Sequence, residues 1–205
     1  MRERSSLGVV LAMLSAIALA TPGIGATQAT PGGATSRTPA DAAEYAASSN
    51  TVKAHALVDA AINMTDSDRA VKILWQATEL DPTLEEAYVY LGLFYNSRSQ
   101  FEKVIEVYQK LVKYQPKEIS AYLNIGEAYM SFSPPKYEAA LPYYRKALEL
   151  DNTSSFAALR MGEIFAQQGN REEAVRYLRL ASGDRSKNPT IATEADRMLR
   201  QMGPS

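Results

Sequence analysis

The sequence predicts an all-α protein, a solenoid of about four helix-turn-helix units closed by a C-terminal helix. The first observation is a repeat of 34 residues, which separates Pro82 from Pro116 and Leu57 from Leu91. The second is that apolar and small residues recur at helical spacing inside each repeat. The third is that a repeat holds two short amphipathic helices, which cannot bury their apolar faces alone. Neighbouring units must therefore stack.

Composition narrows the functions that fit this chain of 205 residues. Its 46% hydrophobic and 22% charged residues are typical of a folded domain, and a formal net charge of −1 gives no electrostatic case for nucleic acid. The absence of cysteine excludes disulfides, thiolate metal sites and Cys nucleophiles. The single histidine, His55, has Asp59 four residues on but no third metal ligand nearby. We therefore expect no catalytic residues, metal or cofactor.

Residues 1–26 have the pattern of a signal peptide. Arg2 and Arg4 precede an apolar run of 14 residues, from Leu7 to Ala20, which suits a signal sequence and is short for a bilayer span. Small residues at Ala20 and Ala26 offer cleavage sites, of which Ala26 is preferred. An uncleaved signal anchor is the alternative. We expect an exported protein, periplasmic or extracellular, or membrane-tethered if the signal stays.

Residues 27–50 are predicted to be a flexible linker. Between residues 21 and 49, 23 of 29 residues are Ala, Thr, Pro, Gly or Ser, and no apolar period runs through them. Such a stretch buries too little surface to offset the entropy of ordering. An extension of the following helix through Ala42–Ala47 is the alternative.

The repeat region covers residues 51–188, in units of about 51–84, 85–118, 119–154 and 155–188. In the second unit, the spacing predicts helices over Glu85–Ser97 and Phe101–Tyr114. The third unit is two residues longer, because Gly126 and Gly162 are 36 apart. We place the extra residues in 131–136, which contain two consecutive prolines and predict an enlarged turn.

These units resemble the tetratricopeptide repeat (TPR), whose pattern is a large aromatic, Leu-Gly, Tyr, a small residue, an aromatic and Pro. The second unit matches with Tyr88, Leu91, Gly92, Tyr95, Val104, Tyr108 and Pro116. The third matches with Tyr122, Ile125, Gly126, Tyr129, Ala140 and Tyr144, and the fourth with Met161, Gly162, Phe165, Ala174 and Leu178. The first unit is weaker, with Val58 in the glycine position. The resemblance implies a right-handed superhelical solenoid.

The resemblance also implies packing roles. Gly92, Gly126 and Gly162 would let the two helices of a unit approach closely, and Val58 would hold those of the first unit apart. Tyr95, Tyr129 and Phe165 would fill the space between adjacent units. Trp75 is expected to pack under the neighbouring unit.

Residues 189–202 are predicted to form a helix that caps the last repeat. Asn188 is a candidate N-cap, and Pro189 suits the first helical position. Its apolar stripe comprises Ile191, Ala195, Met198, Leu199 and Met202. A solenoid needs such a cap for solubility, and a dimerisation helix is the alternative.

In TPR proteins the first helix of each unit lines a concave groove. By that resemblance, the candidate protein-binding residues here are Val89, Tyr90, Leu93, Leu123, Asn124, Glu127, Phe156, Leu159, Arg160 and Glu163. Five of them would form an apolar strip that faces water, which is typical of a partner surface: Val89, Leu93, Leu123, Phe156 and Leu159. The alternative is that Phe156 or the linker partly fills the groove.

Two polar groove residues could contact a peptide. The TPR cochaperones that bind acidic chaperone tails use a five-residue carboxylate clamp, and Asn124 and Arg160 match two of its positions. Val89, Leu93 and Phe156 stand where that clamp has Lys, Asn and Lys, so a complete clamp is absent. We expect an extended or helical apolar segment with at most one acidic contact. The alternative for Arg160 is a salt bridge to Glu127 or Glu163.

The sequence as a whole predicts an exported TPR scaffold or adaptor that binds a protein or peptide and assembles an extracytoplasmic complex. End-to-end self-assembly into a homo-oligomer is the second hypothesis. A hydrolase using Glu127 and Glu163 is a remote third, since a water-filled groove is a poor place to raise a carboxyl pKa.

Overall fold

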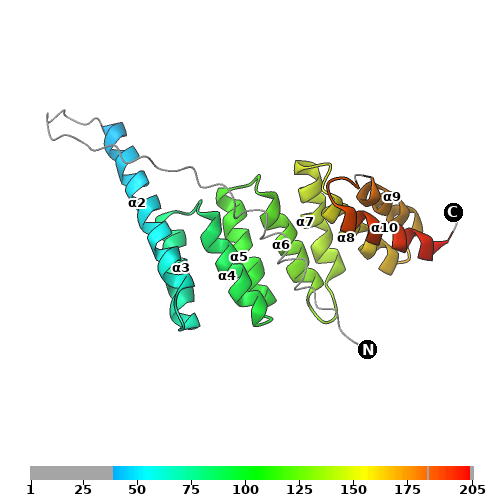
Figure 1. Cartoon of the computed structure of the whole chain (residues 1–205), viewed down its shortest axis with the longest axis horizontal. Helices are drawn as coiled ribbons and strands as arrows, with labels where there is room; N and C mark the ends of the chain where they lie inside the picture. Colours follow the sequence, from blue (N-terminus) through cyan, green and yellow to red (C-terminus); the bar gives the residue numbers. More distant parts are fainter. Residues whose placement is uncertain (1–38, 184, 204–205) are drawn as a thin grey trace. The chain divides into compact units, whose positions relative to one another are not determined.

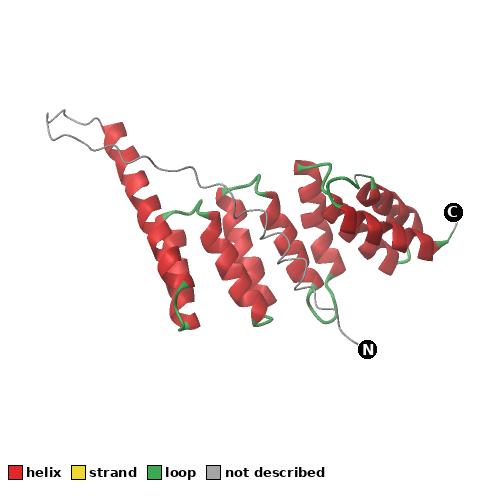
Figure 2. Ribbon diagram, in the orientation of Figure 1, coloured by secondary structure: helices red, strands yellow, loops and turns green. Residues whose placement is uncertain are grey.

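The computed structural model describes residues 39–183 and 185–203, and over these residues it contains α-helices and no strand (Figure 2). Their bounds are α2 (Pro39–Ile62), α3 (Ser67–Leu80), α4 (Glu85–Ser97), α5 (Phe101–Tyr114), α6 (Ile119–Met130), α7 (Tyr137–Leu150), α8 (Ser155–Gln167), α9 (Arg171–Ser182) and α10 (Pro189–Met202). Each helix packs on the next one along the chain, so that four helix pairs stack in sequence order and α10 follows the last pair (Figure 1). The predicted solenoid of four helix pairs with a terminal helix is confirmed.

The first helix begins earlier than the sequence pattern predicts. α2 starts at Pro39, so the linker boundary at residue 50 is wrong, and the helical extension weighed for Ala42–Ala47 is what the structure shows. Alanine has the highest helix propensity, and proline is tolerated in a first turn. The predicted signal peptide and linker residues 27–38 lie outside the described residues.

Aspartates stop the second helices in a repeated way. Asp81 follows α3, and its Oδ1 accepts hydrogen bonds from Thr83 N at 2.9 Å and Thr83 Oγ1 at 2.7 Å. Asp151 follows α7 and makes the same two bonds to Thr153, again at 2.9 and 2.7 Å. The turn therefore forms with Pro82 after the first aspartate and equally with Asn152 after the second.

Three glycines are required by the close approach of paired helices. A Cβ at Gly92 would lie 2.5 Å from the Tyr108 hydroxyl, and one at Gly126 would lie 2.6 Å from the Tyr144 ring. A Cβ at Gly162 would lie 2.7 Å from Leu178. In the first unit Val58 takes the glycine position and is fully buried in the same core as Leu74, a side chain smaller than the tyrosines of the next two units.

Aromatic contacts join the units, but not all as expected. Trp75 on α3 donates from Nε1 to the Tyr95 hydroxyl on α4 at 3.2 Å, which confirms both as contacts between units. Phe132, in the enlarged turn 131–136, packs on Phe101 of the preceding unit with ring centroids 5.6 Å apart. Phe165 packs against a cluster that includes Tyr144 of the preceding unit, and it also stacks on Tyr177 of its own unit at 5.5 Å.

The last helix covers the end of the stack. Asn188 is the N-cap of α10 and proline occupies the first turn, as predicted. Ala192 and Ala195 are fully buried, and the apolar stripe of α10 packs on a cluster that includes Leu178 and Ala181. Polar residues of α10 remain on the outside.

Candidate protein-binding face

The first helices of the units share one face, which we call the first-helix face and define as the adjoining sides of α2, α4, α6 and α8. Polar contacts link its members in order. His55 Nδ1 lies 3.8 Å from Glu86, Ser120 Oγ donates to Glu85 at 3.2 Å, and Arg160 Nη2 donates to Glu127 at 2.6 Å. The second helices form the other layer, where Lys110 donates to Thr78 at 3.3 Å. Each predicted groove residue lies on α4, α6 or α8.

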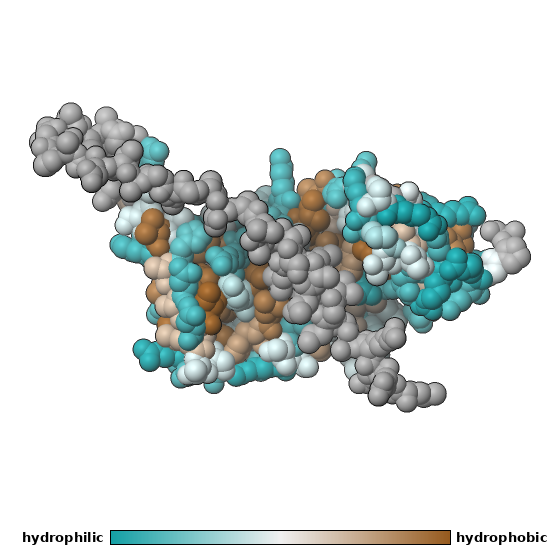
Figure 3. All heavy atoms as spheres, viewed as in Figure 1, coloured by the Kyte–Doolittle hydropathy of each residue, from teal (hydrophilic) through white to brown (hydrophobic). Residues whose placement is uncertain are grey.

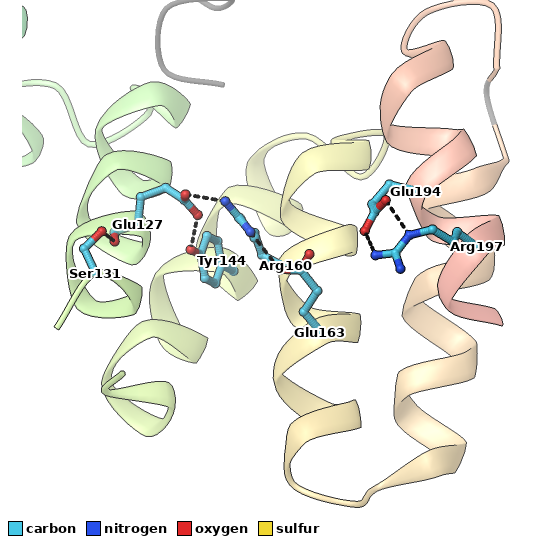
Figure 4. Close-up of polar contacts among 7 residues, drawn as sticks. All are labelled: Glu127, Ser131, Tyr144, Arg160, Glu163, Glu194 and Arg197. Atoms are coloured by element: carbon cyan, nitrogen blue, oxygen red, sulfur yellow. Dashed lines mark hydrogen bonds and ion pairs between the residues drawn. The ribbon is translucent and has the colours of Figure 1, made fainter. Parts of the chain in front are cut away.

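Arg160 is the centre of a polar network between α6 and α8 (Figure 4). Its Nη2 donates to Glu127 Oε2 at 2.6 Å and its Nη1 to Glu163 Oε2 at 2.8 Å. Tyr144, from α7, donates its hydroxyl to Glu127 Oε1 at 2.5 Å. The side chains of Arg160, Glu127 and Glu163 are only 19%, 16% and 22% exposed. These three charge-assisted hydrogen bonds make up the network, and the one between Arg160 and Glu127 ties the third unit to the fourth.

Burial and charge set the protonation of this network. Burial alone opposes the charged form of Arg160, but the adjacent Glu127 and Glu163 carboxylates outweigh it and hold its pKa above the usual range. Burial and the negative charge of Glu127 raise the pKa of Tyr144 well above its ordinary value. Arg160 is therefore charged and Tyr144 neutral at any physiological pH.

The two residues that match the carboxylate clamp are already engaged. Arg160 has two internal carboxylates and lies over the Phe156 ring at 5.1 Å, so the predicted alternative of a salt bridge is correct. Asn124 Nδ2 donates to the carbonyl of Ser120, one turn back, at 2.8 Å. An acidic partner group at Arg160 would have to compete with these internal carboxylates, whose combined charge already exceeds that of the guanidinium.

The apolar strip is shorter than expected. Leu123, Phe156 and Leu159 are only 8%, 7% and 6% exposed. The first two belong to a core cluster with residues of α7, and Leu159 belongs to one with residues of α9 and α10. Val89, Tyr90 and Leu93 on α4 are half-buried and remain at the surface. Of the predicted strip, the residues on α4 are therefore the ones that stay at the surface. Figure 3 shows hydrophobic atoms at the surface over the N-terminal helices.

Sequence reasoning missed a second carboxylate pair, on the edge between α4 and α6. Ser120 donates from Oγ to Glu85 Oε1 at 3.2 Å and from its backbone N to Glu118 Oε1 at 3.1 Å. Both carboxylates therefore meet at one residue. Burial and repulsion from Glu118 raise the pKa of Glu85. The sequence signal was glutamate at the start of two first helices. Acidic residues at helix N-termini are stabilising in themselves, so this pattern did not point to a binding site.

The described part of the chain holds neither a metal site nor a membrane-spanning helix. His55 is half-exposed at the surface of α2, and no group of three or more His, Asp or Glu side chains there is arranged to hold a metal ion. Within the same residues, no helix is both long and apolar enough to span a membrane.

Known sequences match the repeat region. Residues 136–193 match the family model described as Tetratricopeptide repeat. Superkiller complex protein 3 of Homo sapiens is 29% identical over 122 residues, covering 58% of this chain and 8% of that protein. Mitochondrial import receptor subunit TOM70 of Homo sapiens is 27% identical over 113 residues, covering 55% of this chain and 18% of the receptor. The chain thus spans less than a fifth of either relative.

Solved structures share the fold. The crystal structure of MamA is similar with a TM-score of 0.55 at 20% identity, over 72% of this chain and 81% of that one. The TPR2B domain of yeast Sti1 in its pHsp70 complex gives 0.52 at 20% identity, over 57% and 94%. The translocator chaperone SycD of Yersinia enterocolitica gives 0.53 at 22% identity, over 59% and 83%. At these identities the likeness shows the fold alone, a TPR solenoid.

Proposed function

We propose that this protein is a non-enzymatic scaffold, exported from the cytoplasm, that binds a segment of another protein on its first-helix face and helps assemble an extracytoplasmic complex. The observation that carries the proposal is the surface of α4, where Val89, Tyr90 and Leu93 stay half-buried beside carboxylates. An apolar surface rimmed by polar groups is typical of a partner site. The export part of the proposal rests on the signal-like pattern of residues 1–26.

The comparisons support a binding role without naming a partner. Two structural neighbours are described as a TPR domain in a complex with pHsp70 and as a translocator chaperone. Proteins with one fold can have many functions, so the function has to be argued from the residues of the binding face. The carboxylates of the remote hydrolase hypothesis, Glu127 and Glu163, are both paired with Arg160, and an ion-paired carboxylate cannot supply the proton that a glycosidase acid donates.

Affinity capture with matched variants tests the proposal. The tagged full-length protein is crosslinked in its native envelope fraction, and captured proteins are identified by mass spectrometry. Val89→Lys introduces a charge into the apolar surface of α4, and Gln76→Lys introduces the same charge on the exposed side of α3, in the other layer. We expect one partner that is captured by the parent protein and by Gln76→Lys and lost with Val89→Lys, at unchanged helix content. Capture that survives Val89→Lys would contradict binding on this face.

The same preparation tests whether the protein is exported. Intact mass of the purified chain shows whether residues 1–26 are removed, and fractionation shows the compartment. We expect the cleaved chain outside the cytoplasm. An unprocessed chain found only in the cytoplasm would contradict the export proposal and leave the binding proposal intact.

A further inference from the structure

We infer that the segment bound on the first-helix face is amphipathic and basic: apolar side chains that pack on α4, with lysine or arginine side chains that reach the carboxylates between α4, α6 and α8. This inference rests on the proposed function and names the chemistry of the partner. It differs from the sequence-based prediction, an apolar segment with at most one acidic contact, in the sign of the charged contacts.

The first support is the pair of carboxylates at Ser120. Glu85 is the first residue of α4 and Glu118 is the N-cap of α6, and the hydrogen bonds of Ser120, at 3.2 and 3.1 Å, hold both carboxylates at one point. Two like charges held together repel, and a cation placed between them removes that repulsion. An ammonium or guanidinium group from a partner can do so while it keeps part of its own hydration, because both glutamates are only half-buried.

The second support is the charge of the Arg160 network. Arg160 faces Glu127 and Glu163. The neighbouring Arg197, which is paired with Glu194, also interacts with Glu163. Three carboxylates and two guanidinium groups therefore leave an excess negative charge there. Glu163 uses Oε2 for Arg160, and within the described residues its other carboxylate oxygen accepts no hydrogen bond. That oxygen is an acceptor already fixed in place, which lowers the entropy cost of contacting a partner donor.

The third support is the arrangement of these points around the apolar surface. Ser120 and Glu127 are seven residues apart on α6, which places the two acidic points roughly 10 Å apart along the helix. Val89, Tyr90 and Leu93 lie on the adjacent helix α4. A segment with apolar residues against α4 and basic residues spaced about 10 Å apart matches both features. A helix rises roughly 1.5 Å per residue, so its basic residues would be seven positions apart. An extended chain rises roughly 3.3 Å per residue, so its basic residues would be three positions apart.

Defined peptides test the inference. Three fluorescein-labelled 14-residue peptides are compared by fluorescence anisotropy with the full-length protein: one of leucine and lysine, one with every lysine replaced by glutamate, and one with every leucine replaced by serine. We expect the leucine–lysine peptide to bind about tenfold or more tighter than the other two, since both its charge and its apolar side chains are needed. Equal or tighter binding of the glutamate peptide would overturn the inference.

A charge-matched pair of variants assigns the effect to the proposed residues. The double variant Glu85→Gln plus Glu118→Gln removes two carboxylates from the first-helix face. The control Glu102→Gln plus Glu106→Gln removes two exposed carboxylates from α5, in the other layer. We expect the first to weaken binding of the leucine–lysine peptide about fivefold or more and the second less than about twofold, at equal thermal stability. Equal losses in both variants would show attraction by net charge alone and would overturn the site.

This inference and the proposed function fail separately. If the captured partner is lost with Val89→Lys but retained with Glu85→Gln plus Glu118→Gln, the scaffold function stands and the basic segment is wrong. If Val89→Lys has no effect on capture, the scaffold function on this face is wrong and the peptide data concern a different surface.

Discussion

Two contacts between first helices, one at each end of the solenoid, hold neighbouring units in different ways. At the N-terminal end α2 meets α4 through His55 and Glu86, whose Nδ1 and Oε2 atoms are 3.8 Å apart and whose side chains are 53% and 47% exposed. At the C-terminal end α6 meets α8 through Glu127, Arg160 and Glu163, which are at most 22% exposed and bonded at 2.6 and 2.8 Å.

The difference between these two contacts shows what the stacking of one unit on the next requires. Both contacts belong to the same architecture, so a buried ion network is not needed to stack one unit on the next. Where the network is present, its groups are paired with one another, and its excess negative charge is what remains for a partner. Where it is absent, apolar and carboxylate side chains of α4 stay available. We therefore expect the apolar side chains of a partner to pack on the N-terminal side of the first-helix face, with basic side chains that reach toward the network.

The largest effect is expected from removing the centre of the network. Arg160→Met keeps the volume but leaves Glu127 and Glu163 partly buried without a counter-charge, which should lower the free energy of unfolding by about 3 kcal/mol. Urea unfolding at pH 7 measures it.

A compensated variant distinguishes charge from packing in that loss. Adding Glu127→Gln and Glu163→Gln to Arg160→Met removes the uncompensated charges, and we expect it to recover most of the lost stability. If the triple variant is as unstable as Arg160→Met alone, the side chain contributes by packing and the electrostatic account is wrong.

The next largest losses of stability are expected at the glycine position of a unit, which is Gly126 in the third unit and Val58 in the first. Gly126→Val would force a side chain into the Tyr144 ring, from which a Cβ already lies 2.6 Å, and should cost about 3 kcal/mol. Val58→Gly opens a cavity in the first unit and should cost roughly 2 kcal/mol. Thermal unfolding of both variants measures this. A neutral Val58→Gly would mean that the first unit does not use the valine for packing.

Alkaline pH should act on the network through Tyr144. Its folded pKa is raised by burial and by Glu127, so its contribution is complete below the unfolded value of about 10 and is lost as pH rises toward the folded value. At pH 11, one unit above the unfolded value, this one tyrosine should cost on the order of 1 kcal/mol of stability. Urea unfolding at pH 9 and pH 11 compares the parent with Tyr144→Phe. Between pH 9 and pH 11, the free energy of unfolding should fall less in Tyr144→Phe than in the parent, by that amount. An identical fall in both proteins would exclude Tyr144 as a source of the alkaline destabilisation.

The smallest effect is expected at the N-terminal contact. His55→Ala removes an exposed partner of Glu86 and should change the free energy of unfolding by less than about 0.5 kcal/mol. Unfolding at pH 5 and pH 7 measures it. A loss near that of Arg160→Met would remove the distinction between the two ends.

The sequence predicted most of the backbone because the repeat encodes it locally. Glu85–Ser97 and Phe101–Tyr114 are helices with the predicted bounds, and the prolines of 131–136 mark the turn between α6 and α7. The exposure of Leu123, Phe156 and Leu159 could not be predicted, because it depends on what the neighbouring units place against them. The Arg160 pairing was foreseen as an alternative, whereas Tyr144 joins it only through the fold.

Site-specific photo-crosslinking tests the central claim, that the first-helix face binds a protein segment, most directly. A benzophenone amino acid is placed at position 93, on the α4 surface, or at position 76, in the other layer, and the protein is irradiated in its native envelope. We expect a discrete protein adduct from position 93 and none from position 76. An adduct from position 76 alone, or none from position 93 when the partner is captured by chemical crosslinking, would contradict that claim.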